Sequence, residues 1–385
     1  MRIADFWHFW TVGRLAESRL AIGRTPGIEL LAMSAGDFVC RTAFRFCAFF
    51  LFAAFHLGAA PRVPVIYSTD LLHPHVDPDD HFDLACLYAI PEADLRAVIL
   101  DNSVPQANRS GFKPLWQLNY LAGRHVPGAI GLGNKLKSPD DRGLDQPAEH
   151  QNGVNLLLQT LRDSRDTVAI IFVGSARDTV AAFNREPGLF RRKVRSIHGF
   201  IGEASETRFV EYNVGLDPQA FVGLLRSGLP FFWVPCFDGG ESRNDGHASW
   251  WKIRHRQVLE TAPEPLQRYF LYMLRKAPDD PIVWLSLPTS DADRQWLMDG
   301  ERNLWCAALL RLPFGGSIQH EGRDVAGFTP VEVSVSDNAV VRYGKTPGSR
   351  RVMRFEIKDM AHFATAATAA TARLLQSFPI SPHAP

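Results

Sequence analysis

Five aspartates fall within fourteen residues, and they are the feature of the sequence that points most directly to chemistry. They are Asp70, Asp77, Asp79, Asp80 and Asp83. Carboxylates this close together repel one another, which raises some of their pKa values unless a cation or several hydrogen-bond donors compensate. Oxygen ligands of this kind suit Ca²⁺, a hard cation that takes six to eight of them.

The elements that position these acids can be read from the flanking sequence. Residues 63–69 are a short apolar run rich in β-branched side chains, which predicts a strand that ends at Asp70. A loop rich in Pro and His follows, and residues 80–89 then show helical spacing. We therefore expect Asp70 at the end of a strand, with Asp79 and Asp80 at the N-terminus of a helix.

The chain continues as an alternation of strands and helices. Further strands are predicted at residues 95–101, 128–132, 168–173, 196–201 and 230–235, and helices at residues 110–121, 152–161, 176–183 and 218–225. This alternation predicts an α/β fold with a mostly parallel, Rossmann-like sheet flanked by helices on both faces. Sites in such sheets gather at the carboxyl ends of the strands, where Asp70, Asn102 and the loop after Val173 fall.

The C-terminal part is less regular. Helices are predicted at residues 250–259, 265–275 and 301–310. Alternating apolar and polar residues around the turn Asp337-Asn338 predict a small β hairpin over residues 328–343. A third strand at residues 351–357 and a closing helix at residues 360–375 complete the pattern, so residues 61–385 are expected to form one domain.

Residues 1–60 differ in composition from the rest. Arg41 and Arg45 precede an apolar run at residues 46–55, and small residues follow at 58–60. A basic segment, a short apolar core and a small-residue site are typical of a secretory signal peptide. We expect a periplasmic or extracellular protein with no stable membrane span once the signal is removed; the alternative is a buried N-terminal helix.

Charge and cysteine content limit the partners. The formal net charge of the 385 residues is +1, which provides no field for nucleic acid and favours a small neutral ligand. Cys86, Cys236 and Cys306 stand singly in apolar contexts, which indicates buried free thiols. Self-association into a homo-oligomer stays open.

Three blocks together resemble the inosine-uridine preferring nucleoside hydrolase family. The first is the strand that ends in Thr69-Asp70, followed by the pair Asp79-Asp80. The second, Glu211-Tyr-Asn-Val-Gly-Leu-Asp-Pro-Gln-Ala220, is similar to the family's Glu-Phe-Asn-x-x-x-Asp-Pro-x-Ala block. The third and weakest is the turn after Val173. Their order and spacing extend the resemblance over roughly residues 63–312.

The resemblance implies a fold, a cofactor and a reaction. It implies the nucleoside hydrolase fold and hydrolysis of the N-glycosidic bond of a ribonucleoside or related riboside. A calcium-bound water would attack the anomeric carbon, with Asp70 as general base. The implied metal ligands are Asp70, Asp80, the Val173 carbonyl and Asn303. The implied contacts to the sugar are Asp79, Asn102, Glu211 and Asn213.

Departures from the family pattern leave a second function open. The family has an Asp where Ser68 stands, and a His-Asp pair near the position that aligns with Arg302-Asn303. An Arg cannot deliver a proton near neutral pH, and an Asn is a weaker calcium ligand than an Asp. The alternative is therefore a protein that binds a sugar or nucleoside with little turnover. The histidines of the 71–78 loop and His81 could instead act as acids or transition-metal ligands, or simply pack the loop.

Overall fold

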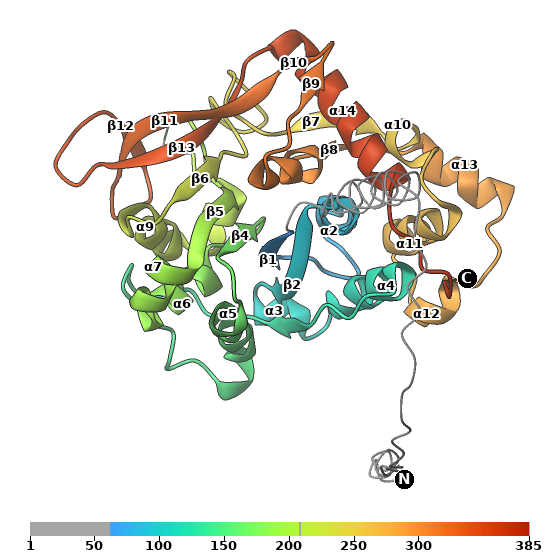
Figure 1. The fold of residues 1–385 in the computed structure, drawn as a ribbon, viewed down its shortest axis with the longest axis horizontal. Coiled ribbons are helices and arrows are strands. Elements are labelled where there is room, and N and C mark those ends of the chain that lie inside the picture. The colour runs from blue at the N-terminus through green and yellow to red at the C-terminus, as the bar shows by residue number, and fades with distance from the viewer. Residues whose placement is uncertain (1–61, 208, 385) are drawn as a thin grey trace, which may run out of the picture. The chain divides into compact units, whose positions relative to one another are not determined.

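A computed structural model describes residues 62–207 and 209–384 of the chain, which belong to one compact unit, Ala60–Pro385. Nine of its strands form one sheet in the order β12-β11-β13-β6-β5-β4-β1-β2-β3 (Figure 1). Pairing is parallel from β3 through to β13, and only β11 and β12 run antiparallel to their neighbours. The predicted α/β class with a mostly parallel sheet is confirmed.

The strands of this sheet begin and end close to where the sequence predicts. They are β1 (Val63–Thr69), β2 (Ala93–Leu100), β3 (Gly128–Ile130), β4 (Val168–Phe172), β5 (Val194–Phe200), β6 (Phe231–Val234), β11 (Ala326–Val335), β12 (Val341–Tyr343) and β13 (Arg350–Ile357). The C-terminal hairpin does not stand apart from the sheet, because β13 pairs in parallel with β6 and extends it.

The centre of the sheet is buried on both faces, because β1 and β4 are apolar at nearly every position. Along β1, Val65 and Tyr67 belong to an apolar cluster with residues of α2 (Asp79–Ala89), α4 (Phe112–Ala122), α11 (Glu264–Leu274) and α14 (Met360–Gln376). Ile66 belongs to a second cluster, with residues of α5 (Asn152–Asp163), α6 (Arg177–Arg185) and α9 (Pro218–Arg226). Figure 1 shows the helices around the central strands. Successive side chains of a strand point to opposite faces, so a continuous apolar run fills both layers.

The helices cover the two faces and fill the C-terminal part. They are α2 (Asp79–Ala89), α3 (Ser103–Gln106), α4 (Phe112–Ala122), α5 (Asn152–Asp163), α6 (Arg177–Arg185), α7 (Pro187–Lys193), α8 (Tyr212–Leu216), α9 (Pro218–Arg226), α10 (Arg256–Leu259), α11 (Glu264–Leu274), α12 (Pro281–Trp284), α13 (Asp291–Asp299) and α14 (Met360–Gln376), with 3-10 turns η1 (Ala148–His150) and η2 (Ala307–Phe314). The predicted helices at residues 265–275 and 360–375 correspond to α11 and α14.

Two helices predicted from the sequence are wrong. Residues 250–259 and 301–310 begin with strands β7 (Trp251–Arg254) and β8 (Glu301–Leu304), which pair antiparallel. Trp251 and Ile253 are buried while Lys252 and Arg254 are exposed, so the local period is two. A further short pair consists of β9 (Gln319–His320) and β10 (Arg323–Asp324).

The predicted signal peptide, residues 1–60, lies outside the described residues, and export stays a prediction. Among the described residues, no helix is both long and apolar enough to cross a membrane. The described cysteines, Cys86, Cys236 and Cys306, are buried and free.

Candidate active site

A cavity of about 540 Å³ opens at the carboxyl ends of the central strands. Asp70 follows β1, Val173 follows β4 and Phe200 ends β5, and all three line it. Asp79 and Asp80, in the first turn of α2, reach it from the side. Parallel strands end at one edge of the sheet, which is why these residues meet although they are far apart in the chain.

Of the three aspartates Asp70, Asp79 and Asp80 that line this cavity, Asp80 is buried, and Asp70 and Asp79 are half-buried. Burial raises the pKa of Asp70 to about 7, an effect that a hydrogen bond with Asp80 reduces. Burial also raises the pKa of Asp80 well above its usual value, and the negative charges of Asp70 and Asp79 add to the rise. Asp80 accepts a hydrogen bond of 2.6 Å from the Thr69 hydroxyl. Without a cation, the cluster holds protons near neutral pH.

Asp83, one turn further along α2, belongs to the same cluster. One carboxylate oxygen from each of Asp79, Asp80 and Asp83 lies within 4.8 Å of the others. Asp83 is fully buried, and burial raises its pKa to about 8. Asp83 does not line the cavity itself but lies behind Asp79 and Asp80.

A buried ionic network fixes the strand ends behind the cavity. Asp101, at the end of β2, accepts a hydrogen bond of 2.8 Å from the Ser175 N–H. Arg177 is 2% exposed and donates from Nε to Asp217 at 2.9 Å. Its other nitrogens donate to the carbonyls of Leu132 and Leu216. Arg177 therefore joins the loops after β3 and β4 to the start of α9.

Glu211 and Asn213 line the cavity and also hold its frame. The Glu211 carboxylate accepts hydrogen bonds from the N–H groups of Gly202, Asn213 and Val214. The Asn213 amide donates to the Val173 carbonyl at 3.0 Å and to the Phe200 carbonyl at 3.1 Å. The carbonyl predicted as a metal ligand is thus held in place by a residue predicted to bind the sugar.

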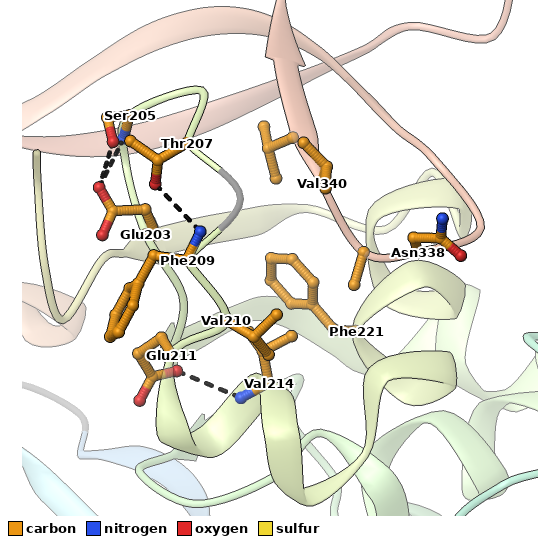
Figure 2. A pocket seen from close by; sticks show the side chains of 12 residues that line it. Glu203, Ser205, Thr207, Phe209, Val210, Glu211, Val214, Phe221, Asn338 and Val340 are labelled. Carbon is orange, nitrogen blue, oxygen red and sulfur yellow. Dashed lines mark hydrogen bonds between the residues drawn. The ribbon is translucent and has the colours of Figure 1, made fainter. Parts of the chain in front are cut away.

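The segment that leads to Glu211 separates this cavity from a small second pocket. Figure 2 shows that pocket, about 20 Å³, between residues 203–214 and the β11–β12 turn at residues 338–341. The Ser205 N–H donates to Glu203 and the Phe209 N–H donates to the Thr207 hydroxyl (Figure 2). Phe209, Val210 and Glu211 line both pockets, so the same short segment borders the main cavity and the second pocket.

Two of the predicted site residues do not line the cavity. Asn102 precedes α3 with a φ of 62°. Asn303 lies in β8, paired with Lys252. Arg302 donates from Nε to His255 Nε2 at 2.9 Å and lies 3.5 Å from Asp77. From the same segment, the residues that do line the cavity are Trp305 and Cys306.

Aromatic side chains that the sequence did not predict also line the cavity, and we call Phe209, Phe237 and Trp305 the aromatic wall. The Phe237 ring contacts the Phe209 ring edge to face, with ring centroids 5.7 Å apart. It contacts the Trp305 ring in the same way, with centroids 6.3 Å apart. Tyr212, which is 64% exposed, lies at the rim. Isolated aromatic residues from separate loops give no spacing signal, so only the fold brings them together.

The histidines near the acidic stretch pack away from the cavity. His73 stacks on Tyr272 and its Nε2 lies 2.8 Å from the Ala277 carbonyl oxygen. His75 and His81 contact each other edge to face. Burial lowers the pKa of His75 to about 4 and that of His81 well below its usual value, so both are neutral. Packing of the loop accounts for them.

Sequence comparison finds ribonucleoside hydrolases. No family model matches the chain. The pyrimidine-specific ribonucleoside hydrolase RihA of Citrobacter koseri is 26% identical over 186 residues, which cover 44% of this chain and 58% of that protein. RihA of an Escherichia coli O1:K1 strain gives the same identity and shares. This chain thus spans little more than half the length of the curated relatives it matches.

Structural comparison agrees with the fold. The effector protein XOO4466 superposes with a TM-score of 0.50 at 15% identity, covering 84% of this chain and 95% of the other. At that identity the likeness concerns the fold. A purine-preferring ribonucleoside hydrolase from Gardnerella vaginalis has a TM-score of 0.49 at 15% identity, with 81% and 99% covered.

Proposed function

We propose that this chain, a divergent relative of the nucleoside hydrolases, hydrolyses the N-glycosidic bond of a ribonucleoside or a related riboside. The observation that supports this most is a single cavity lined by Asp70, Asp79 and Asp80 and also by the aromatic residues Phe209, Phe237 and Trp305. An oxocarbenium-like transition state needs negative charge beside the sugar, and a leaving base needs a flat apolar surface.

We further propose that the site holds Ca²⁺. Buried carboxylates with few hydrogen-bond donors fit a hard divalent cation, and neutral oxygens complete such shells. Asp70, Asp80 and the Val173 carbonyl would hold the ion; that carbonyl has a second lone pair beside the one that Asn213 uses. A bound ion would supply Lewis acidity that makes a nearby water easier to deprotonate. Asn303 is left out because it does not line the cavity.

Asp70 is the group that would remove the proton. As a carboxylate that lines the cavity beside the proposed ion, it is the candidate general base. The water oxygen would form a bond to the anomeric carbon while the bond from that carbon to the base nitrogen breaks. The proton from the water goes to Asp70, and the electron pair of the broken bond leaves with the base.

The sugar would be fixed by the remaining acids and amide. Asp79 lines the cavity, where its carboxyl group would hydrogen-bond to ribose hydroxyls. Glu211 and Asn213 are held rigidly by the hydrogen bonds that they make to the backbone. Rigid positioning of the sugar at the acids supplies a large part of the catalysis in such a site.

The first experiment is hydrolysis of inosine, uridine and p-nitrophenyl riboside by the purified chain, with and without a calcium chelator. We expect cleavage that the chelator stops and added Ca²⁺ restores. Asp70→Asn should lower kcat by on the order of 10²- to 10⁴-fold, because the base is lost. The matched control is Asp94→Asn, an acid on β2 that pairs with Arg96 at the surface. Full activity of the Asp70 variant would contradict the assignment.

A second function, binding of a riboside with little turnover, is favoured by the chemistry of two side chains that line the cavity. Trp305 and Cys306 stand beside the cavity, and burial raises the pKa of the Cys306 thiol well above its usual value. Neither side chain readily protonates a leaving base near neutral pH. A protein that binds a riboside with little turnover would therefore show saturable binding of inosine in calorimetry and no release of base.

A further inference from the structure

We propose that Glu203 is a positioning residue for the base-binding side of the cavity: its carboxylate holds the turn that follows Phe237 and so fixes the aromatic wall against which a base would lie. This inference rests on the proposed function, because it concerns how that cavity binds a nucleoside. Glu203 does not line the main cavity, so it would touch neither the sugar nor the base. It lines the small second pocket instead (Figure 2).

The hydrogen bonds of the Glu203 carboxylate are the first support. Glu203 is 7% exposed, and its Oε1 accepts from the N–H groups of Gly239 at 2.7 Å and of Gly240 at 3.1 Å. The same oxygen accepts from the N–H and the hydroxyl of Ser205. Hydrogen bonds to a carboxylate are roughly twice as strong as those between neutral groups. One buried oxygen therefore ties the turn at residues 239–240 to the segment at residues 203–205.

The backbone of this turn is the second support. Gly239 and Gly240 have φ angles of 97° and 107°. Glycine adopts such left-handed conformations readily, and two glycines in a row give the turn little preference for any one conformation. Among the described residues, Glu203 is the one acceptor that bonds to their N–H groups. The conformation of the turn therefore depends on the Glu203 carboxylate.

The turn is joined directly to the aromatic wall. Phe237, two residues before Gly239, is the ring that contacts both other rings of the wall. Its carbonyl accepts a hydrogen bond of 2.9 Å from the N–H of Ala204. Glu241, which follows the turn, also lines the cavity. Glu203 thus anchors the central ring of the wall from the side that does not face the ligand.

The sugar side of the cavity is held by other elements. Asp70 follows β1, and Asp79 and Asp80 lie in the first turn of α2. The hydrogen bonds of Glu203 reach none of these residues. A nucleoside would contact both sides of the cavity, whereas free ribose would contact only the sugar side. Loss of the Glu203 carboxylate should therefore weaken the binding of a nucleoside and spare that of ribose.

The test compares inosine with ribose in the full chain carrying Glu203→Ala. We expect KM for inosine to rise about tenfold or more, while kcat and the inhibition constant of ribose stay within about threefold of wild type. The reason is that the wall loses its anchor while the acids keep their positions. Hydrogen exchange in the ligand-free protein should show the Gly239 and Gly240 amides exchanging about tenfold faster or more.

Two further variants show whether the acceptor is what matters. In Glu203→Gln, the amide oxygen can replace Oε1, and the NH₂ group replaces Oε2, which is buried without a hydrogen-bond partner among the described residues. KM for inosine should then lie within about threefold of wild type. The matched control is Glu206→Ala, which removes an exposed acid of the same segment that accepts from the Tyr343 N–H instead. Its KM should equal that of wild type.

The outcomes separate this inference from the proposed function. Wild-type KM in a folded Glu203→Ala protein would overturn the role of Glu203. An equal weakening of inosine and ribose would show a purely structural side chain, and a Glu203→Gln protein as weak as Glu203→Ala would show that the acceptor is irrelevant; both results overturn it. If wild type binds inosine in calorimetry without cleaving it, only the hydrolysis fails, and dissociation constants replace KM. If wild type does not bind inosine at all, both proposals fall.

Discussion

Gly174 lets the Asp70 backbone and the Asp101 carboxylate approach the same point behind the cavity. A Cβ added at Gly174 would lie 3.0 Å from Asp101 Oδ2 and 3.1 Å from the Asp70 nitrogen. Both contacts are tighter than ordinary packing, and neither partner can move freely, since Asp101 already accepts from Ser175. A single methyl group here therefore acts on the position of Asp70, the proposed general base.

Gly174→Ala should lower kcat by about tenfold or more, while costing about 1–3 kcal/mol of stability through overpacking. The measurement is kcat beside urea unfolding. Gly188→Ala is the control, because an added Cβ there meets only the end of the flexible Arg192 side chain. An unchanged kcat in Gly174→Ala would mean that Asp70 is not held through this contact.

The acids and the rest of the site differ in how far the sequence could predict them. Asp70, Asp79 and Asp80 were found because a strand end and a helix start stand next to each other in the chain, and they all line the cavity. The sequence does not predict Trp305 and Cys306 as site residues, because residues 301–310 have helical spacing; the strand β8 changes which side chains of that segment reach the cavity.

Among the elements, the junction held by Arg177 matters most for the site. Its side chain touches the loop after β3, the network of Asp101 and the N-terminus of α9, where Asp217 caps the helix. Arg177→Met should destabilise the protein by about 3–5 kcal/mol, because it leaves Asp217 buried and unpaired. Arg226→Met, which breaks the exposed pair with Asp337, should cost less than about 1 kcal/mol. Urea unfolding measures both; equal losses would contradict the difference in burial.

Strand β5 contains a histidine that makes the fold sensitive to acid. His198 stacks on Phe232 with ring centroids 4.5 Å apart, and burial lowers its pKa to about 3. Below about pH 6.5, His198 binds a proton in the unfolded chain but not in the folded one. The contribution of His198 to the unfolding free energy therefore falls as the pH drops from about 6.5 toward 3. Wild type should lose on the order of 2 kcal/mol from this group by pH 4.5.

His198→Phe keeps the stacked ring and removes the titration. Relative to this variant, wild type should lose on the order of 2 kcal/mol of unfolding free energy between pH 7 and 4.5, measured by urea. The slope common to both proteins has other sources: burial lowers the pKa of His255 to about 4, which acts in the same direction, and raises the pKa values of Asp70 to about 7 and Asp83 to about 8, which acts in the opposite one. Identical slopes in the two proteins would show that His198 does not contribute.

For the whole described molecule, periodicity predicted the sheet and its helices better than the connections. Strands β1 to β6 were predicted because buried parallel strands are continuous apolar runs. The antiparallel pair β7 and β8 was missed because its partners are far apart in the chain and each is only four residues long. That β13 would pair with β6 was not predictable either, since hairpin signals are local whereas this contact joins residues over a hundred positions apart.

That last contact has a consequence for synthesis on the ribosome. β6 is left as an open edge until β13 has been made, because β13 is its neighbour on the side away from β5. An exposed strand edge recruits other strands, including those of neighbouring chains. A nascent chain that stalls before residue 350 therefore presents β6 with one unpaired edge and apolar side chains, which favours aggregation until synthesis is complete.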